Sequence, residues 1–329
     1  MAEKGRCQDM KIGVFSVPLY AKPLPEALAY LKSIGVDAVE IGTGGYPGDK
    51  HCRPSELLGD AQKLREFRLL FEENDIELNA LSCHGNPLHP DRDIARKSQE
   101  EFVDTVHLAE ELGVKKVIAF SGCPGDCPDS KYPNWVTCPW PDDFLKVLDY
   151  QWNDCLLPYW RKAGKLAQES GVRIAFELHP GFCVYNTASM LRIRKEIGEV
   201  LGANLDPSHL IWQGNDIITS IRELKGAIYH FHAKDCRVNT FNSTRKGVLD
   251  TVPYSEEAER SWLFCTMGYG HGKEFWKEVI ATLRMVGYDD VLSIEHEDSL
   301  MSEKEGLEKA VAFLQDVVIR EKAAQMWWA

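Results

Sequence analysis

Residues 171–210 read GVRIAFELHPGFCVYNTASMLRIRKEIGEVLGANLDPSHL, and this stretch holds the unit from which the rest of the chain is built. An apolar run at 171–180 predicts a buried strand, residues 187–198 show helical spacing of apolar side chains, and 200–210 predicts a second strand. Parallel strands need a long crossover between them, usually a helix. The stretch therefore predicts a strand–helix–strand unit of a parallel sheet.

The same unit recurs on both sides of this stretch. Strands are expected at 10–16, 37–43, 76–85, 114–122, 171–180, 200–210, 226–235 and 289–298. Helices are expected at 23–34, 58–74, 93–112, 142–170, 187–198, 215–224, 272–286 and 303–322. Eight such units predict a (β/α)8 TIM barrel, because closure pairs every strand edge, and we expect one domain over 1–329 with the barrel at about 10–322. An open doubly wound sheet would need a break in the pattern where the strand order reverses, and the sequence has none.

Two long segments interrupt the pattern, at 121–144 after the fourth strand and at 236–270 after the seventh. Loops of this length in a barrel usually cover the active site or build an interface. The aromatic side chains of Trp135, Trp140, Trp212 and Trp262 have two interpretations. They stack on a sugar or a flat aglycone, or they pack the loops onto the barrel.

The composition narrows the class of protein. The 329 residues carry a formal net charge of −12, which argues against nucleic acid as a partner because no basic surface is available. The sequence holds no apolar run long enough to span a membrane and begins without a secretory signal. Its ten cysteines are scattered and are expected to be reduced thiols, so a cytoplasmic location is predicted. Cys123, Cys127 and Cys138 fit no common zinc pattern.

Acidic and imidazole residues end four successive predicted strands. Glu177, Asp206, His232 and Glu295 are expected at the carboxyl-terminal mouth of the barrel, where a divalent cation would relieve their mutual repulsion. Three carboxylates and one imidazole favour Mn²⁺, while Mg²⁺, Co²⁺ and Zn²⁺ stay open. We therefore predict these four residues as metal ligands. The alternative is that each is a hydrogen-bonded structural residue.

The segments FELHPG, NLDPSHL, HFHAKD and LSIEHED resemble the xylose-isomerase-like barrels of sugar phosphate isomerases and epimerases, over roughly 10–320. The resemblance implies the same four metal ligands, with Glu177 and Glu295 as the acid/base pair. It also implies that His209 holds substrate oxygens near the metal. His179 shares a strand face with Glu177 and is expected beside the substrate as a further catalytic residue.

Other residues at strand ends and in loops are candidates for substrate contacts. They are His84, Glu40, Trp212, Lys234, Asp235 and Arg237. For Glu40 a structural role stays open, and Lys234 with Asp235 could equally form an ion pair at the rim. The glycine-rich run 42–48 does not open a helix, because Pro47 and the polar residues after it intervene, so a nucleotide cofactor is not expected.

The expected chemistry is proton abstraction next to a sugar carbonyl, assisted by the metal. Our main interpretation is the catalytic subunit of a bacterial C-glycoside deglycosidase, which cleaves 3-oxo-C-glucosides and works with a small β subunit. The alternative is a keto-sugar or sugar phosphate isomerase or epimerase. A remote alternative is a nuclease of the endonuclease IV type, and a further one is a non-catalytic scaffold. The tryptophans of the C-terminal AAQMWWA hint at assembly with another chain, so an oligomer is expected.

Overall fold

The computed structural model describes residues 10–321 and 326–328. Eight parallel strands close into a barrel in the order β1-β10-β7-β6-β5-β4-β3-β2, so the last barrel strand pairs with the first. These strands are β1 (Lys11–Phe15), β2 (Ala38–Gly45), β3 (Glu77–His84), β4 (Lys116–Ala119), β5 (Arg173–Glu177), β6 (Leu201–Leu205), β7 (Ile228–Ala233) and β10 (Val291–Ile294). The predicted (β/α)8 TIM barrel is confirmed.

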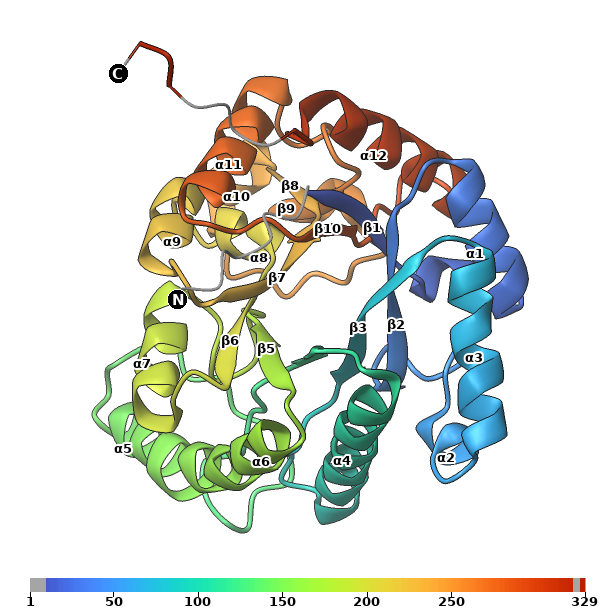
Figure 1. The fold of residues 1–329 in the computed structure, drawn as a ribbon. Coiled ribbons are helices and arrows are strands. Elements are labelled where there is room, and N and C mark those ends of the chain that lie inside the picture. The colour runs from blue at the N-terminus through green and yellow to red at the C-terminus, as the bar shows by residue number, and fades with distance from the viewer. Residues whose placement is uncertain (1–9, 322–325, 329) are drawn as a thin grey trace.

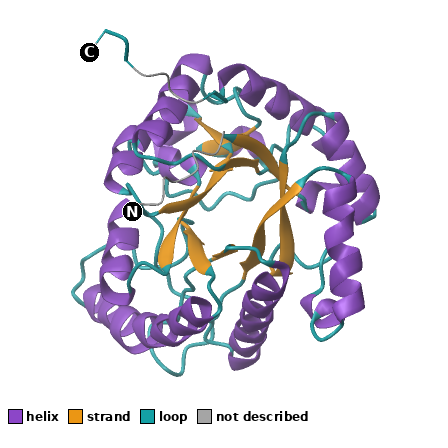
Figure 2. Ribbon diagram, in the orientation of Figure 1, coloured by secondary structure: helices purple, strands orange, loops and turns teal. Residues whose placement is uncertain are grey.

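A ring of helices surrounds the barrel (Figure 1 and Figure 2). The longer ones are α1 (Leu24–Ser33), α3 (Ala61–Glu73), α4 (Arg92–Leu112), α6 (Leu157–Glu169), α7 (Thr187–Ile197), α11 (Lys273–Met285) and α12 (Glu303–Val317). Shorter helices are α2 (Pro54–Leu57), α5 (Asp143–Tyr150), α8 (Pro207–Trp212), α9 (Ile217–Glu223) and α10 (Thr240–Lys246), with single turns η1 (Val17–Leu19), η2 (Gln151–Leu156) and η3 (Glu257–Glu259). Among the described residues, no helix has the length and apolar character that crossing a membrane requires.

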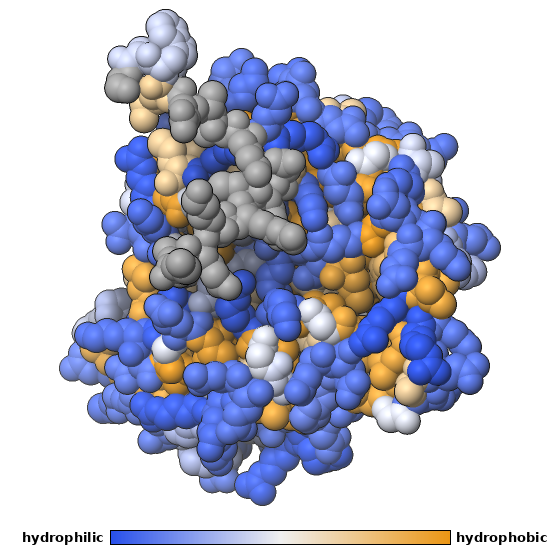
Figure 3. Space-filling model, viewed as in Figure 1, coloured by the Kyte–Doolittle hydropathy of each residue, from blue (hydrophilic) through white to orange (hydrophobic). Residues whose placement is uncertain are grey.

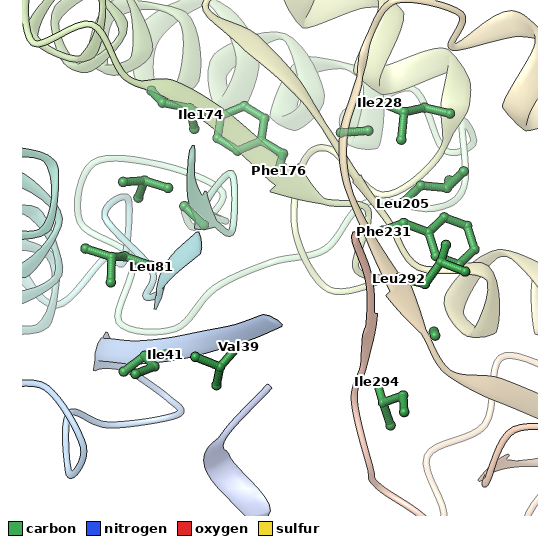
Figure 4. Packing of buried hydrophobic residues seen from close by; sticks show 14 of the residues in the cluster. Val39, Ile41, Leu81, Ile174, Phe176, Leu205, Ile228, Phe231, Leu292 and Ile294 are labelled. Atoms are coloured by element: carbon green, nitrogen blue, oxygen red, sulfur yellow. The ribbon is translucent and has the colours of Figure 1, made fainter. Parts of the chain in front are cut away.

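The apolar core lies between the strands and the helices. Alternate strand residues such as Ile41, Phe176, Phe231 and Ile294 are fully buried in it (Figure 4). Phe176 of β5, for example, meets Trp160 of α6 edge to face, with ring centroids 4.4 Å apart. On the face seen in Figure 3, polar residues cover most of the outer helices and apolar residues show in the gaps between them. The helices are therefore amphipathic, as their sequence spacing predicts.

The other residues of the same strands point inward, and many of them are polar. Glu40, Ser82, His230, His232 and Ser293 are all buried inside the barrel and hydrogen-bond to one another. A second group inside the barrel is apolar and consists of Ala80, Ile118, Ala175 and Tyr229. This polar group extends to the carboxyl-terminal ends of the strands, because His232 lies near the end of β7.

Both predicted long loops are present. Residues 120–142 connect β4 to α5 without a helix or strand, and Gln151 of η2 holds this loop by donating to the carbonyls of Pro124, Gly125 and Asn134. The segment after β7 forms a two-stranded antiparallel sheet, β8 (Asp235–Val238) with β9 (Trp262–Cys265), and α10 and η3 lie between these strands.

Some predicted elements differ from the observed ones. The strand expected at 200–210 ends at Leu205, because Asp206 caps the short helix α8 and Pro207 occupies its first turn. The single helix expected at 142–170 is α5, a π-helical turn and α6. The last helix ends at Val317 rather than 322, since Val318 is extended, and residue 322 lies outside the described residues.

Candidate metal centre

Four acidic and imidazole side chains meet at the carboxyl-terminal ends of the barrel strands. Glu177 is the last residue of β5, and His232 lies near the end of β7. Asp206 and Glu295 directly follow β6 and β10. One donor atom from each of the four lies within 4.8 Å of the others, so they can all reach one ion. The structure thus brings together the four residues that the sequence predicts as metal ligands.

Asp206 has two functions that follow from the sequence Asp-Pro-Ser. Its Oδ1 accepts a hydrogen bond of 2.8 Å from the amide of Ser208 and so caps α8, while Pro207 starts the helix without needing a partner for an amide hydrogen. Its Oδ2 is buried and makes no hydrogen bond of normal geometry. The cap thereby fixes the carboxylate and leaves one oxygen facing the centre.

Glu40 of β2 lies beneath the centre and orients His232. Its carboxylate accepts from His232 Nε2 at 3.0 and 3.1 Å, from His230 Nε2 at 2.8 Å, and from the hydroxyls of Ser82 and Ser293. Burial alone would raise the pKa of Glu40, but His232 and His230 hold it well below its usual range. A proton on His232 Nε2 leaves the Nδ1 lone pair directed at the metal ligands.

Two histidines from other strands and loops support Glu177. His84, which ends β3, places Nε2 at 2.9 Å from Oε2, and His209 of α8 places Nε2 at 3.0 Å from Oε1. Burial would raise the pKa of the Glu177 carboxyl, but the hydrogen bonds from His209 and His84 hold it well below its usual range. Glu177 is therefore a carboxylate at neutral pH.

Lys234 supplies a buried positive charge beside the cluster. Its Nζ lies 3.0 Å from Asp206 Oδ2, 2.5 Å from Glu295 Oε2 and 2.9 Å from Glu297 Oε2. Burial would lower the pKa of this ammonium, but the carboxylates of Asp206, Glu295 and Glu297 raise it well above its usual value. Burial would likewise raise the pKa of Glu295, but Lys234 and His232 lower it to about 2. Both groups are charged at neutral pH.

The donor set fits a divalent cation. His232 Nδ1 faces Glu295 at 3.2 Å and Glu177 at 3.4 Å, and like Asp206 Oδ2 it has no hydrogen bond of normal geometry. The ammonium of Lys234 offsets one of the three carboxylate charges, and a divalent ion bound between the four side chains would offset the rest and would also satisfy His232 Nδ1. The group Glu40, His230 and His232 also lies close enough to hold an ion, but the oxygens of Glu40 already accept four side-chain hydrogen bonds. A third group combines Glu177 with His179 and His209.

A pocket of about 440 Å³ opens onto this centre. Its lining includes the charged residues Glu177, Lys234, Glu295 and Glu297 together with several aromatic side chains. Among these, Phe120 stacks on Phe182 with centroids 4.2 Å apart. The remaining lining residues are Phe15, Val17, Pro18, Tyr46, Pro47, His84, His179 and His296. Phe120, Phe182, His296 and Glu297 were not among the predicted site residues, although Glu297 lies only two residues after Glu295.

Some of the predicted substrate-binding and catalytic residues line this pocket, and others lie outside it. His84, His179 and Lys234 line the pocket. His209 lies behind Glu177, and its ring centroid is 4.1 Å from that of His179. Burial chiefly lowers the pKa of His179, to about 3, so its ring is neutral at physiological pH.

The four other candidates for substrate contacts do not line this pocket. Glu40 is fully buried below His232, with its carboxylate occupied by hydrogen bonds, so no oxygen is left for a sugar hydroxyl. Asp235 is fully buried and accepts from the amides of Gly268, Gly270 and His271, so it anchors a loop. Arg237 is exposed on β8. Trp212 lines a neighbouring cavity instead.

Comparison with known proteins shows the family of the chain. The chain is 39% identical over 313 residues to the uncharacterized protein YfiH of Bacillus subtilis, covering 94% of this chain and 99% of that protein. It is 28% identical over 320 residues to an inosose dehydratase of Bacillus thuringiensis, covering 95% and 97%. A solved structure of the IolI protein with a bound zinc atom superposes with a TM-score of 0.62 at 20% identity, covering 94% and 98%. Residues 28–317 match the family described as xylose isomerase-like TIM barrel, and the chain belongs to that family.

Proposed function

We propose that this chain is a divalent-metal-dependent enzyme that removes a proton from the carbon next to the carbonyl of a keto-sugar or keto-cyclitol, with isomerisation or epimerisation as the first candidate outcome. The observation that carries the proposal is the convergence of Glu177, Asp206, His232 and Glu295 within 4.8 Å at the floor of a polar and aromatic pocket. The 28% identity to an inosose dehydratase over nearly the whole chain supports the substrate class, and it makes dehydration the second candidate outcome.

The residues around the pocket can bind the substrate and move a proton. Glu295 is a carboxylate at neutral pH and lines the pocket, so either of its oxygens can accept a proton from carbon. Glu177 lines the same pocket, and its oxygens accept hydrogen bonds from the ring N–H groups of His84 and His209, which can hold a proton near Oε2 or Oε1. His179 is neutral and can accept a hydrogen bond from a sugar hydroxyl. The ammonium of Lys234 can donate to a substrate oxygen.

A cation bound by Glu177, Asp206, His232 and Glu295 would supply Lewis acidity, which lowers the pKa of a C–H bond next to a carbonyl. We propose Mn²⁺ first, because three of the four donors are carboxylates, with Mg²⁺, Co²⁺ and Zn²⁺ as alternatives. The zinc is a feature of the IolI structure. At 20% identity to this chain, that structure shows the shared fold and does not assign the metal.

Cleavage of 3-oxo-C-glucosides together with a small β subunit is the narrower proposal. It begins with the same proton abstraction and differs in that the aglycone then leaves. The xylose isomerase-like family and the inosose dehydratase named above support the isomerase, epimerase or dehydratase interpretation better than C-glycoside cleavage. A nuclease of the endonuclease IV type is disfavoured, because a chain with net charge −12 would repel a polyanion.

The test is metal analysis of the purified protein, followed by an activity screen with and without chelator. The screen uses inososes, simple ketoses and 3-oxo-glucosides. We expect about one divalent ion per chain, and we expect Glu177→Gln and Asp206→Asn to lose both the ion and the activity. Asp93→Asn, an exposed carboxylate of α4, is the control and should change neither. A protein that binds no divalent ion under any loading condition would overturn the proposal.

A further inference from the structure

The charged side chains around the metal pocket do not balance one another. Among the described residues that line the pocket, Glu177, Glu295 and Glu297 are acidic, and Lys234 is the only lysine or arginine. Asp206 adds a fourth carboxylate, because its Oδ2 lies 3.0 Å from the Nζ of Lys234. Four negative charges, set against one positive charge from Lys234 and two from a divalent ion, leave a net charge of −1 in the loaded centre.

The one ammonium of the pocket already has partners on every side. The Nζ of Lys234 lies within 3.0 Å of a carboxylate oxygen of each of Asp206, Glu295 and Glu297. It also lies 4.5 Å from the centroid of the Phe264 ring. An ammonium has three N–H donors, and three carboxylates are in place to accept them. A phosphate or carboxylate group on a substrate would therefore have to compete with these carboxylates for Lys234.

Glu297 differs from the other two partners of Lys234 because it is not a predicted metal ligand. Asp206 and Glu295 belong to the group of four side chains that can reach one ion, and Glu297 does not. The Glu297 side chain is 49% exposed, whereas the Lys234 side chain is 2% exposed. When an ion occupies the centre, Glu297 is therefore the carboxylate that stays free to pair with Lys234, and its negative charge remains in the lining of the pocket.

The uncharged part of the lining offers nothing that would hold an anion. It consists of the apolar and aromatic side chains of Phe15, Val17, Pro18, Tyr46, Pro47, Phe120 and Phe182. A like charge that a binding site does not pair lowers affinity, and such a repulsive group is a common source of specificity. A phosphate group would meet the Glu297 carboxylate without a compensating cation, whereas a sugar hydroxyl would not be repelled.

We propose that Glu297 is a specificity-determining residue that makes this pocket bind uncharged keto-sugars or keto-cyclitols and reject their phosphorylated or carboxylated counterparts. The inference rests on the proposed function for the chemistry at the metal centre. It deepens that function, because the resemblance to sugar phosphate isomerases and epimerases leaves phosphorylated substrates open, and the charges around Lys234 disfavour them.

The experiment is calorimetric titration of the metal-loaded and the metal-free protein with D-fructose, D-fructose 6-phosphate and inorganic phosphate. We expect the wild type to bind D-fructose about tenfold or more tightly than its 6-phosphate at low salt. This preference should shrink when NaCl is raised from about 20 to about 500 mM, because salt screens the partly exposed charge of Glu297. Rejection of the phosphate by its size would not depend on salt.

Variants of Glu297 test the assignment to this residue. Glu297→Gln keeps the shape and removes the charge, so it should bind D-fructose 6-phosphate and inorganic phosphate about tenfold more tightly than the wild type. Glu297→Asp keeps the charge and should retain the preference for D-fructose. Glu100→Gln is the matched control, because Glu100 is an exposed carboxylate that pairs with Arg96 on α4, and all three affinities should stay as in the wild type. Thermal melting shows that each variant is folded.

Three results would overturn the charge selection. They are equal affinity of the wild type for D-fructose and its 6-phosphate, a preference that does not change with salt, and no gain of phosphate affinity in Glu297→Gln. The two proposals fail separately. A protein that binds no divalent ion but rejects phosphate through Glu297 loses the proposed function and keeps the charge selection. A metal-dependent enzyme that converts D-fructose 6-phosphate as readily as D-fructose keeps the function and loses the selection.

Discussion

Glu40 is the residue on which the geometry of His232 depends, although it is sealed from the pocket. It accepts hydrogen bonds from Nε2 of both His230 and His232, so it fixes which nitrogen of His232 carries the proton. A β-bulge between Val39 and Glu40 shifts the register of β2 against β3 at this point. Bulges of this kind re-aim a side chain, and here the side chain reaches across the barrel interior to β7.

Replacement of Glu40 should therefore weaken metal binding, although Glu40 is not a predicted ligand of the metal. We expect Glu40→Gln to raise the dissociation constant for Mn²⁺ or Zn²⁺ by about 10- to 100-fold, because a neutral amide no longer holds the His232 ring in one tautomer. Competition with a chromophoric chelator measures the affinity, and nitrogen NMR of the histidine rings reports the tautomer. Glu101→Gln, which alters another carboxylate that contacts β2 through the amide of Gly45, is the control. An unchanged affinity with a changed tautomer would contradict the expected coupling.

At the scale of elements, one buried aspartate ties the segment after β7 to the barrel. Asp235 accepts from the amides of Gly268, Gly270 and His271 at 3.2, 3.0 and 2.8 Å. It also accepts from His271 Nδ1 at 2.8 Å and from the indole of Trp276 on α11 at 3.3 Å. The carboxylate thus fixes the end of the segment after β7, which also contains Tyr254 and Trp262.

Loss of this carboxylate should loosen that segment before it unfolds the barrel. We expect Asp235→Ala to lower the free energy of unfolding by about 3 kcal/mol, because several amides lose a charged acceptor. Limited trypsin digestion should then cut at Arg245 or Lys246 at least tenfold faster than in the wild type. Glu259→Gln in the same segment removes only an exposed pair with Arg245 and should leave the cutting rate unchanged. Equal cutting of Asp235→Ala and wild type would show that other contacts hold the segment.

The opposite end of the barrel depends on a second buried charge. Lys116 of β4 places Nζ at 2.6 Å from Asp290 Oδ2, just before β10, and at 2.7 Å from Asn79 Oδ1 of β3. Burial would raise the pKa of Asp290, but the ammonium of Lys116 lowers it below its usual value. A lowered folded-state pKa means that the stabilisation is complete above the ordinary aspartate value of about 4 and is lost as pH falls through the lower value.

Asp290→Asn should therefore lower the free energy of unfolding at neutral pH and have little effect on it in acid. We expect a loss of about 2 kcal/mol at pH 7, because the mutation leaves the ammonium of Lys116 without its charged partner. The difference from the wild type should shrink as pH falls below about 4. Urea unfolding between pH 3 and 7 measures it. A difference that grows in acid would have the wrong sign for this pair.

The predicted elements agree with the observed ones where one hydrophobic periodicity runs uninterrupted. They differ where a local signal, such as a helix start, interrupts that periodicity. The helix at 93–112 shifted by one residue at its start, because Asp91 caps it and Gly113 ends it in the left-handed region. The strand predicted at 200–210 is longer than β6, because the Asp206-Pro207 pair starts α8 within that range. That pair is itself a helix-start signal and could have been used.

At the scale of the whole molecule, the barrel and the four converging side chains were predictable because they depend on strand order alone. Once eight parallel strands close, all strand ends meet on one rim. What the sequence could not give is which neighbours fill the interior. The pairing of Glu40 with His230 and of His84 with Glu177 joins strands far apart in the chain. The cavity lined by Trp135, Trp212 and Trp262 likewise depends on how the loop after β4 packs against the segment after β7, and sequence periodicity does not determine that packing. The predicted oligomer, the small β subunit and the cytoplasmic location stay predictions.

Metal removal should affect the stability of the entire barrel, because β5, β7 and the residues after β6 and β10 all supply a predicted ligand. At an ion concentration of about 100 times the dissociation constant, binding adds about 2.7 kcal/mol, or roughly 5 °C in Tm for a chain of this size. Lys234 limits the loss on stripping, since its ammonium remains 3.0 Å from Asp206 and 2.5 Å from Glu295.

Lys234→Met should therefore widen the gap in Tm between the loaded and the stripped protein. The stripped variant keeps a set of buried carboxylates without the neighbouring cation, which is strongly destabilising, whereas a bound divalent ion offsets that charge. Differential scanning calorimetry with and without chelator, on wild type and Lys234→Met, measures both gaps. Lys273→Met, which removes an exposed pair with Asp316, should leave the gap unchanged. If Lys234→Met narrowed the gap, the lysine would stabilise the loaded centre more than the empty one, and its assigned role in offsetting the carboxylate charge of the empty centre would be wrong.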